Sequence, residues 1–346
     1  LASKKTVLYT GAGISVSAGI GQAAKGSAAK GHSWANAEPT PTHFAASELA
    51  KYGLAHGWVQ QNHDGLPQKA GWPQERINEV HGSWFDPSNP VVKYSGSLKD
   101  DLYTDMVALA DTAELVLVMG TSLSGLNADQ MALKAARRAG QSEHDLGFVI
   151  INLQQTEHDG GATMRINAKS DDVLPQLLPL LGLSPLPTRL PAAVKAFKKV
   201  FSRVCVPYDA SGARLDACKN TFDGCTRTGS AQPAAPEAAA RKRMWLDLHA
   251  GAAIKLTQWH NVQGAAQPGM LHIGSDRPTR DPRTGVMCPP HTHEGVGSVV
   301  CRDDASCSIA IDIEGVHMRL GLWWIEAAIR GGISRLPIVN LDPMFE

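Results

Sequence analysis

The chain has 346 residues, 43% of them apolar, and this length allows two or three domains with at least one sizeable core. Its 33 Lys and Arg balance 33 Asp and Glu, and a net charge of zero argues against a dedicated nucleic-acid binder. The longest apolar run, residues 115–119, is strand-sized, so we expect no membrane span. Six cysteines without a C-x-x-C pair favour an intracellular compartment, nuclear or cytoplasmic, over a disulfide scaffold. Because the chain begins at Leu1, an N-terminal targeting segment is left unassigned.

Residues 5–183 alternate short apolar runs with helical periodicity, the pattern of a parallel sheet with crossover helices. Apolar runs predict strands at residues 7–9, 58–59, 115–119 and 148–151. Apolar stripes at helical spacing predict helices over residues 45–52, 102–113 and 128–139. A last helix is expected from Asp171, as N-cap, to Gly182. The sequence therefore predicts an α/β domain over residues 1–183.

The second half of the chain changes character twice. Residues 184–240 are rich in Pro, Ala, Gly and Ser around a basic stretch at 195–203, which predicts a linker. In residues 309–322 the apolar period is two on both sides of Glu314-Gly315, which predicts a hairpin that pairs 313 with 316, 311 with 318 and 309 with 320. We therefore expect residues 241–346 to form a small all-β module.

A glycine-rich turn follows the first predicted strand. In Gly11-Ala12-Gly13-Ile14-Ser15, the missing side chains allow backbone N–H groups to approach a pyrophosphate. The alternative is a tight strand-to-helix turn without a ligand.

Further motifs recur at the ends of the predicted strands. They are Gln61-Asn62-His63-Asp64-Gly65-Leu66, His81-Gly82-Ser83, Gly120-Thr121-Ser122-Leu123 and Ile151-Asn152-Leu153. With these motifs in this order, residues 4–183 resemble the sirtuins. The runs 41–43, 153–159 and 172–174 look most like the class IV branch of that family.

The resemblance implies a Rossmann-type domain that binds NAD and uses a protein acyl-lysine as co-substrate, giving nicotinamide and 2′-O-acyl-ADP-ribose. Asn62 and Asp64 match the nicotinamide pocket of the family, and His81 matches its general base. An imidazole of near-neutral pKa is suited to taking a proton from a ribose hydroxyl. The positions that match cofactor contacts are Gly11, Ala12, Gly13, Ser15, Lys25, Trp34, Gln61, Gly120, Thr121, Ser122, Asn152, Gln154, Lys169 and Ser170. Taken singly, the polar residues of this set also suit caps, turns and buried backbone.

The chain departs from the family at two places. Residues 21–26 stand where the family has Pro-Asp-Phe-Arg, so Lys25 offers only a point charge and Ala24 leaves the shielding ring absent. Between His81 and Gly120 there is no cysteine, although the family carries a zinc ribbon there, so zinc is not expected. A tail set of Cys288, His291 and His293, with Cys301 or Cys307, has ligand chemistry but no standard zinc spacing.

Two hypotheses about the function follow. The first is a divergent NAD-binding protein with reduced deacylase or ADP-ribosyl transfer activity, and a sensor of NAD or ADP-ribose is a variant of it. The alternative is a catalytically dead structural or scaffold subunit. In either case the β module, with its Trp323-Trp324 pair, is expected to contact protein partners unless both tryptophans are core.

Overall fold

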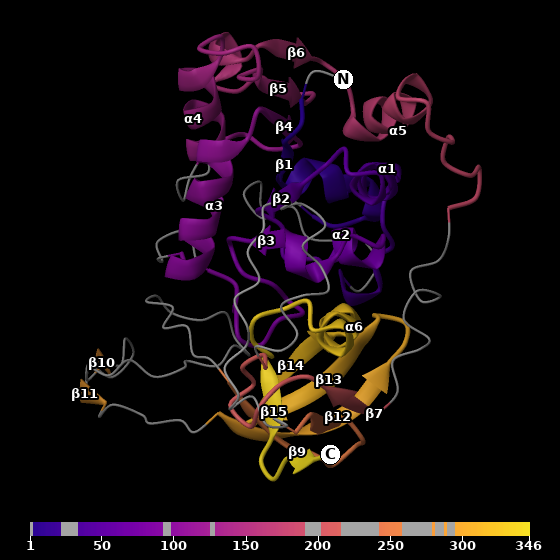
Figure 1. The fold of residues 1–346 in the computed structure, drawn as a ribbon, viewed down its shortest axis with the longest axis vertical. Coiled ribbons are helices and arrows are strands. Elements are labelled where there is room, and N and C mark those ends of the chain that lie inside the picture. Colours follow the sequence, from indigo (N-terminus) through magenta and orange to yellow (C-terminus); the bar gives the residue numbers. More distant parts are fainter. Residues whose placement is uncertain are drawn as a thin grey trace, which may run out of the picture.

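The computed structural model describes residues 3–21, 34–92, 98–124, 129–190, 202–215, 242–257 and 295–346, together with the backbone of β10 (Thr279–Arg280) and β11 (Met287–Cys288). An α/β domain at the N-terminal end is followed by a module built on antiparallel sheets (Figure 1). None of the helices in the described part has the length and apolar character needed to cross a bilayer.

The N-terminal domain contains a six-stranded parallel sheet in the order β3-β2-β1-β4-β5-β6. Its strands are β1 (Thr6–Thr10), β2 (Gly57–Gln60), β3 (Ile77–Glu79), β4 (Leu115–Met119), β5 (Gly147–Ile151) and β6 (Met164–Ile166). The strand order reverses between β1 and β4, and the carboxyl ends of the strands at such a switch point border the crevice where doubly wound folds bind ligands.

Helices cover both faces of this sheet, which is why its central strands β1 and β4 are buried along almost their whole length. On one face lie α1 (Pro41–Lys51) and α5 (Ser170–Leu180), and on the other α3 (Asp100–Thr112) and α4 (Gln130–Arg138) (Figure 1). Shorter helical segments are α2 (Leu66–Lys69), η1 (Ala12–Ala18), η3 (Trp34–Asn36), η4 (Gln74–Arg76) and η5 (Asp159–Gly161). The parallel α/β fold expected for this half of the chain is confirmed.

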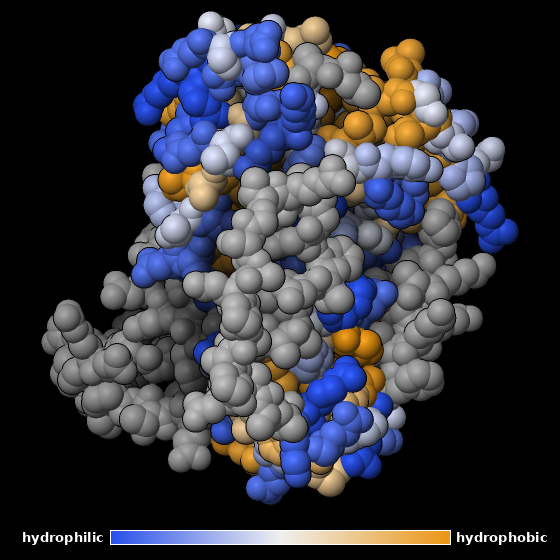
Figure 2. Space-filling model, viewed as in Figure 1, coloured by the Kyte–Doolittle hydropathy of each residue, from blue (hydrophilic) through white to orange (hydrophobic). Residues whose placement is uncertain are grey.

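The start of α5 differs from the prediction. Lys169, not Asp171, occupies the N-cap position. Asp171 lies in the first turn, where its carboxylate accepts hydrogen bonds from the backbone N–H of Thr42, at 3.0 Å, and from the Thr42 hydroxyl. The residue therefore joins α5 to the start of α1. Apolar side chains gather over α5 on the surface (Figure 2), and Leu180 at its end is 80% exposed.

The C-terminal module has a five-stranded antiparallel sheet, β14-β13-β12-β9-β15, and a three-stranded one, β16-β8-β7. The strands are β7 (Arg203–Val206), β8 (Met244–Asp247), β9 (Ala253–Leu256), β12 (Val296–Asp303), β13 (Ser308–Ile313), β14 (Val316–Gly321), β15 (Ile338–Asn340) and β16 (Met344–Phe345). The β13–β14 hairpin pairs Ile313 with Val316 and Ile309 with Leu320, as its alternating pattern predicts.

The module is not all-β, contrary to the prediction. Helix α6 (Leu322–Arg330) follows β14 directly and carries both Trp323 and Trp324. Its buried residues, which include Ile325 and Ala328, recur at helical spacing. The sequence pattern did not predict this helix, because Leu322 also fits the period of two of the preceding strand.

The segment expected to be a linker, 184–240, contributes to the module. Its strand β7 pairs with β8, and the hydroxyl of the buried Tyr208 donates a hydrogen bond to the carbonyl of Ile333 at 2.7 Å. The Pro- and Gly-rich composition around β7 masked a strand of only four residues.

Candidate functional site

The turns that follow β1 and β4 touch each other at the switch point of the sheet. The N–H of Gly11 donates to the Met119 carbonyl at 3.1 Å, and the N–H of Gly13 donates to the Gly120 carbonyl at 2.7 Å. A Cβ atom on Gly13 would lie 2.6 Å from the Gly120 Cα, so a side chain there would force the turns apart. The glycines thus serve close backbone packing, and these two N–H groups are not the free donors that the motif predicted.

Three predicted residues form one buried hydrogen-bond network between the β1 and β2 turns. The Ser15 hydroxyl donates to Asp64 Oδ2 at 2.7 Å, and Asn62 Nδ2 donates to Ser15 Oγ at 3.0 Å and to the Gly11 carbonyl at 3.1 Å. Asp64 Oδ1 accepts the N–H of Leu66 at 3.0 Å. The network fixes the orientation of the amide and the carboxylate before any ligand binds.

A second group joins the ends of β2, β4 and β5. Gln61 Nε2 donates to Thr121 Oγ1 at 3.0 Å and to the Tyr9 hydroxyl at 2.7 Å, while Asn152 Nδ2 donates to the Thr121 carbonyl at 2.9 Å. Next to them, Ser122 is exposed and its hydroxyl lies 2.8 Å from that of Ser124. Gln61, Thr121 and Asn152 therefore meet, as their strand-end positions predict.

His81 follows β3, and its ring lies within hydrogen-bonding reach of the Gln61 backbone. Its Nε2 is buried and has no hydrogen-bond partner among the described residues. Burial, and to a lesser degree the neighbouring His63, lower the pKa of His81 to about 4, although the bond to Gln61 opposes this shift. The near-neutral pKa expected from sequence was therefore wrong. The imidazole is therefore neutral at pH 7.

Other predicted cofactor positions lie outside these two networks. Trp34 is 37% exposed and packs on Trp84, with ring centroids 4.6 Å apart. Lys169 is the exposed N-cap of α5, and the buried Ser170 accepts a hydrogen bond from Thr42 Oγ1 at 3.0 Å. The side chain of Gln154 is exposed, and Ala12 is exposed in the β1 turn. Lys25 lies outside the described residues.

Sequence reasoning missed two charged residues buried beside the site. Burial and the nearby Asp86 raise the pKa of Glu79 to about 8, and Gln60 Nε2 donates to its carboxyl at 3.3 Å. Lys69 is 2% exposed and donates to the carbonyls of Ala35 at 2.8 Å and Ala37 at 3.1 Å. The sequence does place each of them next to a motif, because Glu79 stands just before Val80-His81-Gly82 and Lys69 stands just before Ala70-Gly71.

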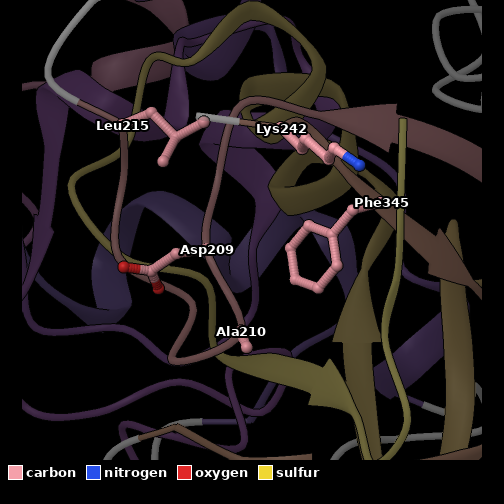
Figure 3. A pocket seen from close by; sticks show the side chains of 5 residues that line it. All are labelled: Asp209, Ala210, Leu215, Lys242 and Phe345. Atoms are coloured by element: carbon pink, nitrogen blue, oxygen red, sulfur yellow. The ribbon is translucent and has the colours of Figure 1, made fainter. Parts of the chain in front are cut away.

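Within the described ranges, no group of three or more His, Cys, Asp or Glu residues is arranged to hold a metal ion. The tail set falls largely beyond those ranges: His291 and His293 are not described, and Cys288 is described only in its backbone. A hollow of about 370 Å³ lies in the C-terminal module (Figure 3), lined by Asp209, Ala210, Leu215, Lys242 and Phe345. It includes none of the predicted site residues.

No family model matches the chain. Among curated proteins, NAD-dependent protein deacetylase SRT1 of Oryza sativa subsp. indica is 29% identical over 232 residues, covering 52% of this chain and 46% of the relative. NAD-dependent protein deacetylase 1 of Pyrobaculum aerophilum is 28% identical, covering 41% of this chain and 66% of the relative. NAD-dependent protein deacetylase sirtuin-7 of Homo sapiens is 27% identical, covering 52% and 58%. About half of the chain is sirtuin-like.

The sirtuin motifs all lie before residue 175, so we assign the likeness to the N-terminal domain, called the sirtuin-like domain below. The chain spans about half the length of the plant SRT1 relatives that it matches. Among solved structures, that of Sir2Tm bound to a propionylated peptide covers 53% of this chain and 95% of that chain at 24% identity, with a TM-score of 0.46.

Proposed function

We propose that the sirtuin-like domain binds NAD or ADP-ribose at the carboxyl edge of its parallel sheet. We further propose that it carries NAD-dependent protein-lysine deacylase or ADP-ribosyl transfer chemistry at a reduced rate, within an intracellular compartment. The observation that carries this proposal is the buried Nε2 of His81, which has no hydrogen-bond partner among the described residues. The His81 ring lies next to the backbone of Gln61, the residue before Asn62.

The residues present fit a dinucleotide in chemistry. Asn62 offers an amide of fixed orientation that can bind the carboxamide of nicotinamide. Asp64 offers a carboxylate of fixed orientation that can stabilise positive charge developing on the ribose. Gln61, Thr121 and Asn152 supply hydroxyl and amide groups at three adjacent strand ends. When bound, NAD supplies a nicotinamide leaving group on a ribose. His81 then acts as a proton acceptor through Nε2, which has no hydrogen-bond partner in the described part of the chain.

Three features support a reduced rate. The low pKa of His81 makes it a weaker base than an unperturbed imidazole. The N–H groups of Gly11 and Gly13 are engaged inside the protein. Residues 21–26 lack the aromatic ring and the arginine that the family has at this point of the sequence. Within the family, the motifs at 41–43 and 153–159 support a place near class IV, and the cysteine-free segment between His81 and Gly120 supports the loss of the zinc ribbon.

One observation favours the alternative, a catalytically dead scaffold subunit that contacts protein partners through the C-terminal module. The polar groups of Ser15, Asn62 and Asp64 bond to one another, so they also have a purely structural use. In that case an acyl-lysine protein would be no substrate, and the domain would serve as a docking surface.

Calorimetry with NAD and with ADP-ribose on the full chain separates the two functions. We expect binding with a Kd of about 1–100 μM, followed by slow nicotinamide release that rises when an acyl-lysine peptide is added. Absence of binding to either nucleotide would contradict the proposal and favour the scaffold.

Asp64→Asn provides the specific test, with Asp86→Asn as its matched control. Both aspartates are buried and accept the backbone N–H two residues ahead, from Leu66 at 3.0 Å and Ser88 at 2.9 Å. We expect Asp64→Asn to lower nicotinamide release about tenfold or more, and Asp86→Asn to leave it unchanged. Equal effects would show that the loss comes from folding rather than from the site.

A further inference from the structure

Helix α6 of the C-terminal module packs directly on the sirtuin-like domain (Figure 1). Trp323 on this helix is 3% exposed, and its ring centroid lies 5.1 Å from that of Phe85 in an edge-to-face arrangement. A Cβ atom on Gly65 would lie 2.7 Å from Trp323 Cζ2, so the indole rests on the Gly65 backbone. Just before α6, the N–H of Gly321 donates to the Phe85 carbonyl at 3.0 Å. The module thus contacts two loops of the domain at their backbones.

These two loops carry the candidate site. Gly65 directly follows Asp64, and Phe85 stands four residues after His81. The loops are also joined to each other, because the Trp84 N–H donates to the His63 carbonyl at 2.9 Å and His63 Nδ1 lies 2.8 Å from the Gly82 carbonyl oxygen. A displacement of one loop is therefore transmitted to the other.

Phe85 extends the contact to a third segment. Its ring lies 5.7 Å from that of Trp34, and the ammonium of Lys69 stands 5.2 Å from the Phe85 ring centroid. Lys69 in turn donates to the carbonyls of Ala35 and Ala37. One aromatic side chain thus connects α6, the loop after His81 and the segment 34–37.

We propose that Trp323 is a positioning residue and that the C-terminal module clamps the loops bearing Asn62, Asp64 and His81. Neither loop is a regular element over these residues, so each depends on packing for a fixed position. The Trp323 indole supplies that packing for both loops, through Gly65 in one and Phe85 in the other. The effect on nucleotide affinity rests on the proposed function, whereas the clamp itself does not.

Hydrogen exchange of the full chain tests the clamp without a ligand. In Trp323→Ala we expect amide exchange in residues 61–66 and 81–85 to speed up about tenfold or more, while β12–β14 stay protected. Trp323→Phe should restore slow exchange because a ring again fills the space. Trp323→Leu, which fills part of it, provides the same test with a smaller disturbance of folding.

Trp324→Ala is the matched control, because Trp324 is the next residue of α6 and packs, partly buried, on the core of the module. Exchange in the two loops should stay unchanged in this variant. Unchanged loops in Trp323→Ala and Trp323→Leu, or equal acceleration in Trp324→Ala, would overturn the clamp.

Calorimetry with ADP-ribose on the same variants tests the coupling to the site. We expect Trp323→Ala to lower the affinity about tenfold, with recovery in Trp323→Phe and no change in Trp324→Ala. If the wild type binds no ADP-ribose, the proposed function fails, and the exchange experiment still decides the clamp. Faster loop exchange with unaltered affinity would overturn the coupling.

Discussion

His81 is held by one hydrogen bond to the Gln61 backbone and leaves a buried nitrogen without a described partner. A buried polar atom without a partner is destabilising, so such an atom close to the carboxyl ends of the strands points to a ligand. The pKa of about 4 means that this ring accepts protons weakly and is neutral over the physiological range.

His81→Ala should lower the rate of acyl transfer from an acyl-lysine peptide to ADP-ribose about a hundredfold or more and change the affinity for ADP-ribose less than about threefold. The reason is that the variant removes the proton acceptor but none of the groups assigned to hold the nucleotide. Steady-state rates and calorimetry on the same preparation provide the two values. A large loss of affinity would identify His81 as a structural residue instead.

Glu79 gives the protein a pH-dependent stability. Its pKa is raised from 4.5 to about 8 by burial, so the folded state keeps a proton that the unfolded chain loses above pH 4.5. The free energy of unfolding should therefore fall between pH 5 and pH 8. Glu79→Gln should remove about 1–3 kcal/mol of that fall, as measured by urea unfolding at both values.

Glu48→Gln serves as the comparison for this effect, because Glu48 is a partly exposed residue of α1. It should leave the pH dependence as in the wild type. A Glu79→Gln variant with an unchanged slope would contradict the buried, protonated state.

At the scale of elements, the glycine-rich turns after β1 and β4 show that one motif can serve two purposes. The motif predicts a close approach of the backbone to a pyrophosphate, whereas the structure shows a close approach of the two turns to each other. Gly13→Ala should destabilise the protein by about 1–3 kcal/mol because the new Cβ meets the backbone of Gly120. Gly160→Ala, where no atom of the described residues lies within 4 Å of the added Cβ, should change stability by less than about 0.5 kcal/mol. Denaturant unfolding of both variants checks this, and similar small effects would refute the packing account.

Element prediction succeeded where the pattern is long and local. The strands β1, β2, β4 and β5 followed from short apolar runs, and the register of the β13–β14 hairpin followed from the apolar period of two. The strands β3 and β6 have three residues each, too few to display a period. Helix α6 and strand β7 were missed because neighbouring residues suggested another structure.

The site was predicted only in part. Strand-end positions brought Ser15, Asn62 and Asp64 together, and likewise Gln61, Thr121 and Asn152. The sequence had no local signal for the engaged N–H groups of Gly11 and Gly13 or for the pKa of His81, because each depends on contacts between distant segments. The contact of Trp323 with Phe85 joins residues 238 positions apart, and periodicity carries no information at that separation.

At the scale of the whole molecule, Phe85 belongs to a loop of the sirtuin-like domain but is buried in the core of the C-terminal module. The two units should therefore unfold together in a single calorimetric transition. Phe85→Ala should lower stability by about 3–5 kcal/mol and separate the transitions of the two units.

Phe148→Ala is the control for this coupling, because Phe148 is about equally buried and, among the described residues, belongs to the core of the sirtuin-like domain. It should destabilise the protein without separating the units. Two transitions in the wild type would refute a shared core.

The most direct test of the central claim is hydrogen exchange of the full chain with and without saturating ADP-ribose. A dinucleotide site at the switch point predicts slower exchange in residues 11–15, 61–64, 81–83 and 120–123, with no change in β7, β8 and the hollow around Phe345. Protection confined to the C-terminal module, or none at all at saturation, would contradict the assignment of this edge of the sheet as a nucleotide site.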